Sequence, residues 1–156
     1  MNNCIEFSSV IPLSEMSGDS DADTELLSNM AEEAKAFIQA FDWCRGIRNS
    51  YFGAGVGGVV GVFFFRIFPA TEEVDEYLWV IVGDIPPAYL VTDENRTPSE
   101  ALQSYISEMR AWVAAVESGQ SIDELIPVNV IPTRESAQAL KSRLNFLETK
   151  SCRSAV

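Results

Sequence analysis

Two strongly apolar segments do most to limit the folds open to this chain. Residues 59–68 (VVGVFFFRIF) and 77–82 (YLWVIV) are rich in β-branched and aromatic residues and are bordered by turn residues, which predicts two β-strands. Side chains alternate between the two faces of a strand, and here apolar residues occupy consecutive positions, so both faces are apolar. The sheet that these strands form therefore needs cover above and below.

Helical patterns on both sides of the strands can supply that cover. Apolar residues recur at helical spacing in residues 24–44, and again after the sequence TPSE (97–100), which is a capping box with proline at the first helical position. Gly119 ends that second helix, and Thr133 begins a last one. Between the first helix and the strands, the glycine-rich segment 45–58 indicates a helix end followed by a loop.

The order of these elements predicts a single α+β domain. We expect a three-stranded antiparallel meander packed against an N-terminal helix and two longer C-terminal helices. The predicted strands cover residues 59–68, 77–83 and 88–92. A chain of 156 residues is long enough for one core. We divide it into a flexible acidic N-terminal segment (1–23), the domain (24–150) and a frayed tail (151–156).

Charge and composition exclude several classes of function. The 23 acidic residues outnumber 11 basic ones, for a net charge of −12, which disfavours binding to nucleic acid or to an anionic membrane. The absence of histidine excludes histidine-dependent catalysis and histidine-ligated metals. The three cysteines form no CxxC pair, and the N-terminus does not resemble a signal peptide. We predict a cytoplasmic protein without a metal or cofactor.

The segment 53–58 (GAGVGG) matches the glycine pattern of dinucleotide-binding loops. That pattern requires a preceding strand and a following helix. Here a predicted helix end precedes it, and VVGVFFF follows, which is poor helix material. The uncharged run 50–65 is also shorter than the roughly 20 residues that a transmembrane helix needs. We therefore predict that these glycines let the chain leave a helix and enter the sheet.

Arg66 is the one charged residue inside the apolar strand 59–68. We expect it to pair with a carboxylate, and Asp84, Asp75 and Glu76 are nearby in the predicted meander. The alternative is a small-ligand or enzyme site in which Arg66, Asp84 and Tyr89 converge near the turn GDIPP (83–87). A closed apolar pocket that contains all three side chains would favour this alternative.

Carboxylates concentrate in the segments that connect the predicted strands and lead to the next helix. They indicate an acidic rim that holds a basic protein partner, although turn chemistry alone also explains several of them. The predicted partner-binding residues are Glu72, Glu73, Asp75, Glu76, Asp84, Asp93 and Glu94.

Residues 60–131 carry a resemblance, of which WVIVGDIPPAYLVTD (79–93) is the specific part. In this region the chain resembles a widespread group of small uncharacterised bacterial proteins, which implies no established activity. In size, acidity and α+β layout it is also similar to immunity proteins of bacterial toxin systems. That similarity implies a non-catalytic binding module that occludes a basic site on a cognate toxin. A structural or regulatory homodimer, in which a second copy covers an open sheet face, is a further alternative.

Overall fold

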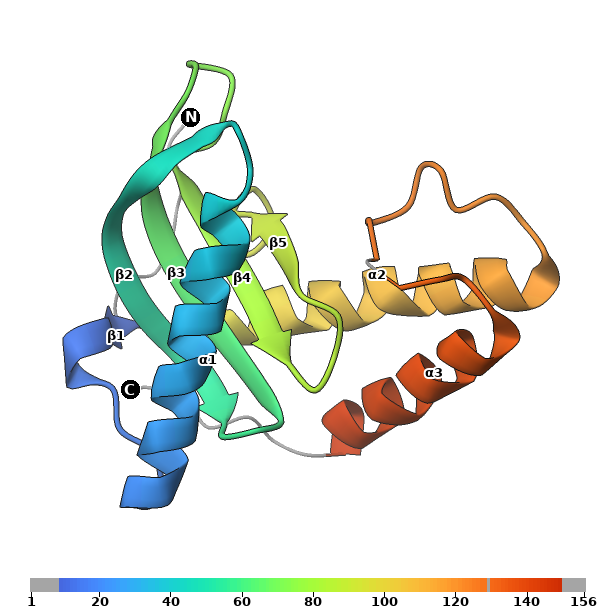
Figure 1. Cartoon of the computed structure of the whole chain (residues 1–156), viewed down its shortest axis with the longest axis horizontal. Coiled ribbons are helices and arrows are strands. Elements are labelled where there is room, and N and C mark those ends of the chain that lie inside the picture. Colours follow the sequence, from blue (N-terminus) through green and yellow to red (C-terminus); the bar gives the residue numbers. More distant parts are fainter. Residues whose placement is uncertain (1–8, 129, 150–156) are drawn as a thin grey trace.

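A computed structural model describes residues 9–128 and 130–149 of the chain as an α+β fold (Figure 1). Five strands form one sheet in the order β1-β2-β3-β4-β5, and every neighbouring pair is antiparallel. The α+β class is confirmed, but the predicted three-stranded meander is part of a sheet with two additional strands. The last helix has 16 residues and is shorter than the N-terminal helix of 19, whereas we predicted it to be longer. The elements are β1 (Ile11–Pro12), the 3-10 helix η2 (Leu13–Glu15), α1 (Asp21–Gln39), β2 (Cys44–Val56), β3 (Val60–Pro69), β4 (Tyr77–Gly83), β5 (Ala88–Val91), α2 (Pro98–Ser118) and α3 (Arg134–Thr149).

Strand β2 corrects the prediction that residues 45–58 form a helix end and a loop. It pairs with β3 along almost its whole length. Its glycines allow helices to approach: a Cβ atom on Gly53 would lie 2.8 Å from Pro98 Cγ, and one on Gly55 would lie 3.0 Å from Leu27 Cδ2. Gly53 and Gly55 therefore serve close packing against α2 and α1.

The N-terminal segment is more ordered than predicted. Strand β1 pairs with β2, and α1 begins at Asp21, where the Ser20 side chain accepts a hydrogen bond from Asp23 N. Asp23 Oδ1 in turn accepts from Gly57 N at 2.8 Å, which ties the helix start to the β2–β3 turn. Part of the segment 1–23 thus belongs to the domain, whereas residues 1–8 and the tail 151–156 lie outside the described residues.

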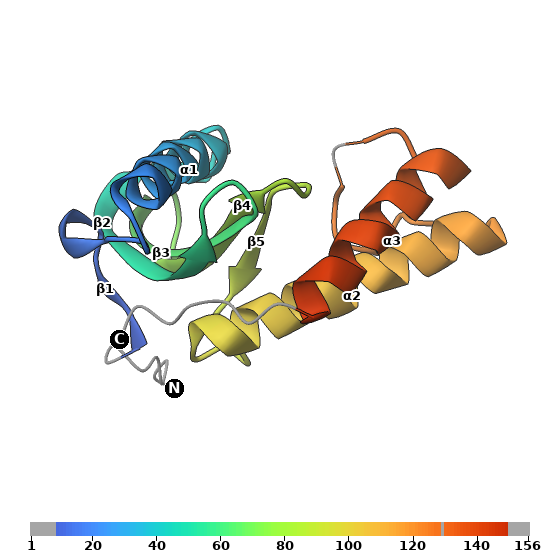
Figure 2. The ribbon, with the colours of Figure 1, turned by 90° about the horizontal axis from the view of Figure 1, so that it is seen from below.

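The chain's own helices cover both faces of the sheet (Figure 2). Phe63 and Phe65 of β3 belong to the core on the α1 side, whereas Phe64 and its β4 neighbour Trp79 belong to the core with α2 and α3. All four side chains are fully buried. The two-sided cover expected from the apolar strands is therefore present within one chain, and a second copy is not needed to supply it.

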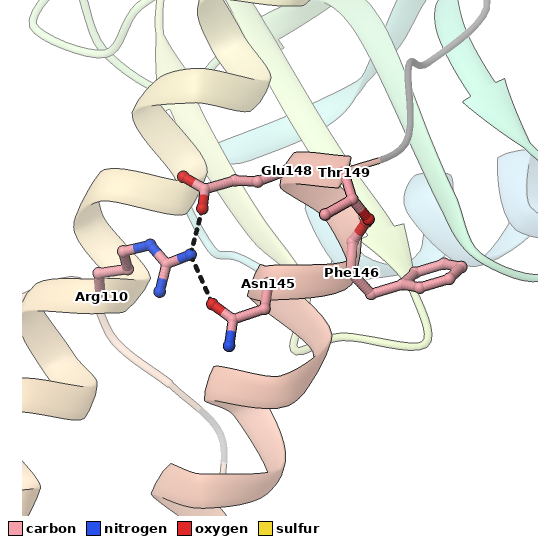
Figure 3. A network of polar contacts seen from close by, with 5 residues as sticks. All are labelled: Arg110, Asn145, Phe146, Glu148 and Thr149. Carbon is pink, nitrogen blue, oxygen red and sulfur yellow. Dashed lines mark hydrogen bonds and ion pairs between the residues drawn. The ribbon is translucent and has the colours of Figure 1, made fainter.

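Helices α2 and α3 form a hairpin that extends beyond the sheet (Figures 1 and 2). Thr97 caps α2 as predicted, accepting a hydrogen bond from Glu100 N, and Gly119 ends it with a φ of 75°. Arg110 of α2 donates to Asn145 and Glu148 of α3 (Figure 3). None of the helices in the described ranges is long and apolar enough to cross a membrane.

Candidate functional site

Six of the seven predicted partner-binding carboxylates lie at one end of the sheet. Residues 70–76 connect β3 to β4, and residues 92–97 lead from β5 to α2. Because Val91 stands opposite Leu78, at the start of β4, these two connections leave the sheet at the same end. Figure 1 shows the arrowhead of β5 pointing toward the end that carries the β3–β4 connection. The six carboxylates are Glu72, Glu73, Asp75, Glu76, Asp93 and Glu94.

Most of this acidic end is free of ion pairs. Within residues 9–128 and 130–149, Glu76 alone of the six forms one, with Arg66 Nε. Glu72, Glu73, Asp75, Asp93 and Glu94 are all exposed. We call these six carboxylates the acidic end of the sheet.

Asp84, the seventh predicted carboxylate, lies at the opposite end of β4. Its backbone N donates to Val59 O, and its carboxylate accepts from Arg143 Nε of α3 at 3.1 Å. Asp84 therefore links the β4–β5 turn to the helical hairpin and is separate from the acidic end.

Arg66, Asp84 and Tyr89 do not converge on one site. Arg66 stands opposite Tyr77 at one end of β4, and the seven residues of that strand separate it from Asp84 by on the order of 20 Å. Tyr89 packs on the α1 side of the sheet, whereas Tyr77 packs on the α2 side. The structure thus provides no shared pocket for the three residues.

The partner of Arg66 is Glu76, one of the three carboxylates that the sequence left open. The Arg66 guanidinium also lies 5.5 Å from the centre of the Tyr77 ring. The hydrogen bond to Glu76 is the main reason that the pKa of Arg66 is raised. Both side chains are partly exposed, so this is a structural ion pair at the edge of solvent.

An apolar groove of about 620 Å³ runs beside strand β5. Four parts of the chain form it: the end of α1, the strand itself, α2, and the connection between α2 and α3. The lining residues are Phe37, Phe41, Pro87, Ala88, Tyr89, Leu90, Val91, Glu108, Ile126, Pro127 and Val128. Its size is that of a typical ligand-binding cleft.

Aromatic side chains fix the α1 side of the groove. Phe41 stacks on Trp43 with ring centres 4.8 Å apart, and both rings meet Tyr89 edge-on at 5.3 and 5.1 Å. Phe37 contacts Phe41 in the same way at 5.3 Å. These contacts hold the wall in place independently of any bound molecule.

Two backbone hydrogen bonds show which residues of β4 bond to β3. Asp84 N donates to Val59 O at 3.0 Å, and Ile67 N donates to Glu76 O at 2.8 Å. Bonded pairs alternate along an antiparallel ladder. The even-numbered residues of β4 therefore bond to β3, and the odd-numbered residues bond to β5.

The same alternation leaves β5 with backbone groups that point away from the sheet. Ala88 and Leu90 stand opposite odd-numbered residues of β4 and form the ladder, whereas Tyr89 and Val91 face outward. In agreement, the Val91 carbonyl accepts from the Asn95 side chain at 2.9 Å. The N–H groups of Tyr89 and Val91 have no hydrogen-bond partner in the described part of the chain.

Glu108 of α2 is the only charged side chain that lines the groove. It is exposed, and among the described residues it forms no hydrogen bond or ion pair. No group of His, Cys, Asp and Glu in the ranges 9–128 and 130–149 is arranged to hold a metal ion. The site therefore offers an apolar surface, free backbone donors and one carboxylate.

Sequence reasoning missed this groove, although some of its signals were present. Phe37 and Phe41 belong to the apolar residues that recur at helical spacing in residues 24–44. The sequence PVNVIP (127–132) is largely apolar and lies between the two C-terminal helices. An apolar segment between two helices was the available signal.

Comparison with known proteins gives no relative from which a function could be transferred: no protein-family model, curated protein or solved structure matches the chain.

Proposed function

We propose that the chain is a non-catalytic, cytoplasmic protein-binding module that engages a basic partner through the acidic end of its sheet. The most specific form of this proposal is an immunity protein that occludes a basic site on a cognate toxin. The observation that carries it is the gathering of six carboxylates, five of them free of ion pairs in the described structure, at one end of a rigid sheet.

Electrostatics supports a binding role more than a catalytic one. The six carboxylates of the acidic end are part of the net charge of −12, and such a field speeds the approach of a positively charged partner. A catalytic site built from Arg66, Asp84 and Tyr89 lacks support, because strand β4 separates Arg66 from Asp84.

The test uses the protein encoded next to this gene as the candidate toxin. Both chains are produced together, growth of the host is measured, and the rate of association is measured on the purified proteins. We expect this chain to restore growth. The double variant Asp93→Asn/Glu94→Gln should slow association by about 3–10-fold at low salt and by less at high salt.

A matched control separates the effect of charge at the acidic end from the effect of the protein's net charge. Glu25 and Glu33 are exposed on α1 and form no ion pair in the described structure. The variant Glu25→Gln/Glu33→Gln therefore changes the net charge by the same amount. It should alter the association rate by less than about twofold. Equal effects of the two double variants would contradict binding at the acidic end.

A further inference from the structure

We propose that strand β5 binds an extended segment of the partner protein as an added sixth strand, with a lysine or arginine of that segment paired with Glu108. This inference rests on the proposed binding function and specifies how part of the partner is recognised. It concerns the groove, whereas the proposed function depends on the acidic end.

The backbone of β5 provides the first part of the recognition. The N–H groups of Tyr89 and Val91 point away from the sheet and have no partner in the described structure. The outward carbonyl of Tyr89 supplies an acceptor between them. A peptide in extended conformation can satisfy these groups in the same way as a neighbouring strand.

The side chains of the groove provide the second part. An added strand directs alternate side chains to opposite faces of the sheet. On one face they meet the aromatic wall formed by Phe37 and Phe41, and on the other they meet Ile126 and Val128. The groove thus selects a segment with apolar residues on both faces.

Charge determines which kind of segment fits. Glu108 is the single charge of the groove. A lysine or arginine directed toward α2 can pair with Glu108, which has no ion pair in the described part of the chain. An acidic segment would be repelled.

The same charges disfavour a second copy of this chain as the occupant. Pairing two β5 strands edge to edge would bring two Glu108 side chains into the same junction. It would also join two chains that each carry a net charge of −12. Like charges brought close together repel, so we assign the groove to a partner segment of opposite charge.

The first experiment identifies the preferred segment without knowledge of the partner. A phage-displayed library of random peptides of about ten residues, the upper length of a typical strand, is selected on the full-length protein. We expect enrichment of peptides with consecutive apolar residues and one lysine or arginine. The best peptide is then synthesised, and its affinity is measured by calorimetry.

A pair of variants at Val91 tests the backbone contact. Val91→Pro removes an outward N–H without removing a ladder hydrogen bond, and Val91→Thr keeps that N–H at similar size. We expect the proline variant to weaken binding of the selected peptide by about tenfold or more. The threonine variant should remain within about threefold.

Modified peptides test the same contact while the protein stays unchanged. Methylating one backbone nitrogen of the peptide at a time removes one donor at a time. A peptide bound as a strand directs every second N–H toward β5, so the loss of affinity should recur with a period of two. This result does not depend on how well the proline variant folds.

The charge contact is tested with a Glu108→Gln variant. We expect it to weaken the lysine-containing peptide by about 3–10-fold. It should have little effect on the same peptide with norleucine in place of lysine. As a control, Glu117→Gln changes an α2 carboxylate outside the groove and should leave the affinity unchanged.

Several results would overturn the inference: no enriched peptide, equal affinity for wild type and Val91→Pro, or loss of affinity without a period of two. A dimer in solution that Val91→Pro converts to monomer would assign the edge to a second copy and would also overturn it. Failure here, together with a partner sensitive to Asp93→Asn/Glu94→Gln, would leave the proposed function intact. A selected peptide that behaves as expected, together with a partner insensitive to Asp93→Asn/Glu94→Gln, would remove the acidic-end mechanism and leave the inference about β5 intact.

Discussion

The two edges of the sheet differ in how far they are closed to further pairing. Strand β1 has two residues, one of them Pro12, which has no N–H to offer, and the chain then turns into η2. Strand β5 has four residues, no proline within it, and a groove along its outer side. Proteins commonly blunt their edge strands to prevent unwanted pairing. The strand β1 is short and contains proline, whereas β5 is accessible along a groove, which marks β5 as the edge strand suited to binding.

The largest expected effect contrasts a core residue beside the β5 edge with a residue of the β1 edge. Trp79, opposite Leu90 of β5, is fully buried, whereas Ile11 of β1 is only partly buried. We expect Trp79→Ala to lower the free energy of unfolding by about 3–5 kcal/mol and Ile11→Ala by about 1 kcal/mol. Urea denaturation of both variants measures the difference. Similar losses would contradict the difference in burial between these two side chains.

A second prediction concerns the hydrogen bonds of Asn95 at the end of β5. Asn95 is buried, its side chain donates to Val91 O, and it accepts from Ser104 Oγ at 2.6 Å. Asn95→Ala leaves these groups without partners, and we expect a loss of about 1–3 kcal/mol. Ser104→Ala, which removes only one of the bonds, should cost less. Thermal unfolding can compare the two variants. An equal or larger loss for Ser104→Ala would contradict the claim that Asn95 stabilises the end of β5 through both hydrogen bonds.

A third prediction concerns pH and the start of β5. The Tyr105 hydroxyl donates to Pro86 O at 2.6 Å, and burial raises its pKa above the ordinary 10.0. Above pH 10 the unfolded chain therefore loses this proton while the folded chain keeps it, so stability falls as pH rises. We expect the slope that this residue contributes to steepen through pH 10 and to approach about 1.4 kcal/mol per pH unit near pH 11. Urea denaturation between pH 9 and 11 should show a shallower decline for Tyr105→Phe, and parallel curves would refute the assignment.

The smallest effect is expected at the link between the β4–β5 turn and the helical hairpin. Asp84 and Arg143 are both largely exposed, so their ion pair should contribute less than about 1 kcal/mol. Asp84→Asn and Arg143→Gln, alone and combined in a double-mutant cycle, measure the coupling. A coupling of several kcal/mol would show that the hairpin helps to hold β5 in place.

The sequence was sufficient where local chemistry determines structure. The apolar segments 59–68 and 77–82 predicted strands that need cover on both faces, and Thr97 with Gly119 marked the ends of α2. Strand β2 was missed because the role of Gly53 and Gly55 depends on residues distant in the sequence that pack against them.

The candidate site was harder to predict for a similar reason. The sequence placed six acidic residues in the connections that follow the first and third strands of the predicted meander. Because strand direction alternates in a meander, these two connections leave the sheet at the same end. The partner of Arg66 depends on the register of β3 and β4, which composition does not reveal. The groove combines side chains from α1, β5, α2 and the segment before α3, and no local pattern contains all four.

Amide hydrogen exchange along β5 tests the central claim most directly. Ala88 and Leu90 form ladder hydrogen bonds, whereas the amides of Tyr89 and Val91 face the groove. In the monomeric protein we predict slow exchange at positions 88 and 90 and exchange at least about a hundredfold faster at positions 89 and 91. Addition of the selected peptide should slow exchange at 89 and 91. Equal protection of all four amides in the free monomer would contradict an open edge at β5.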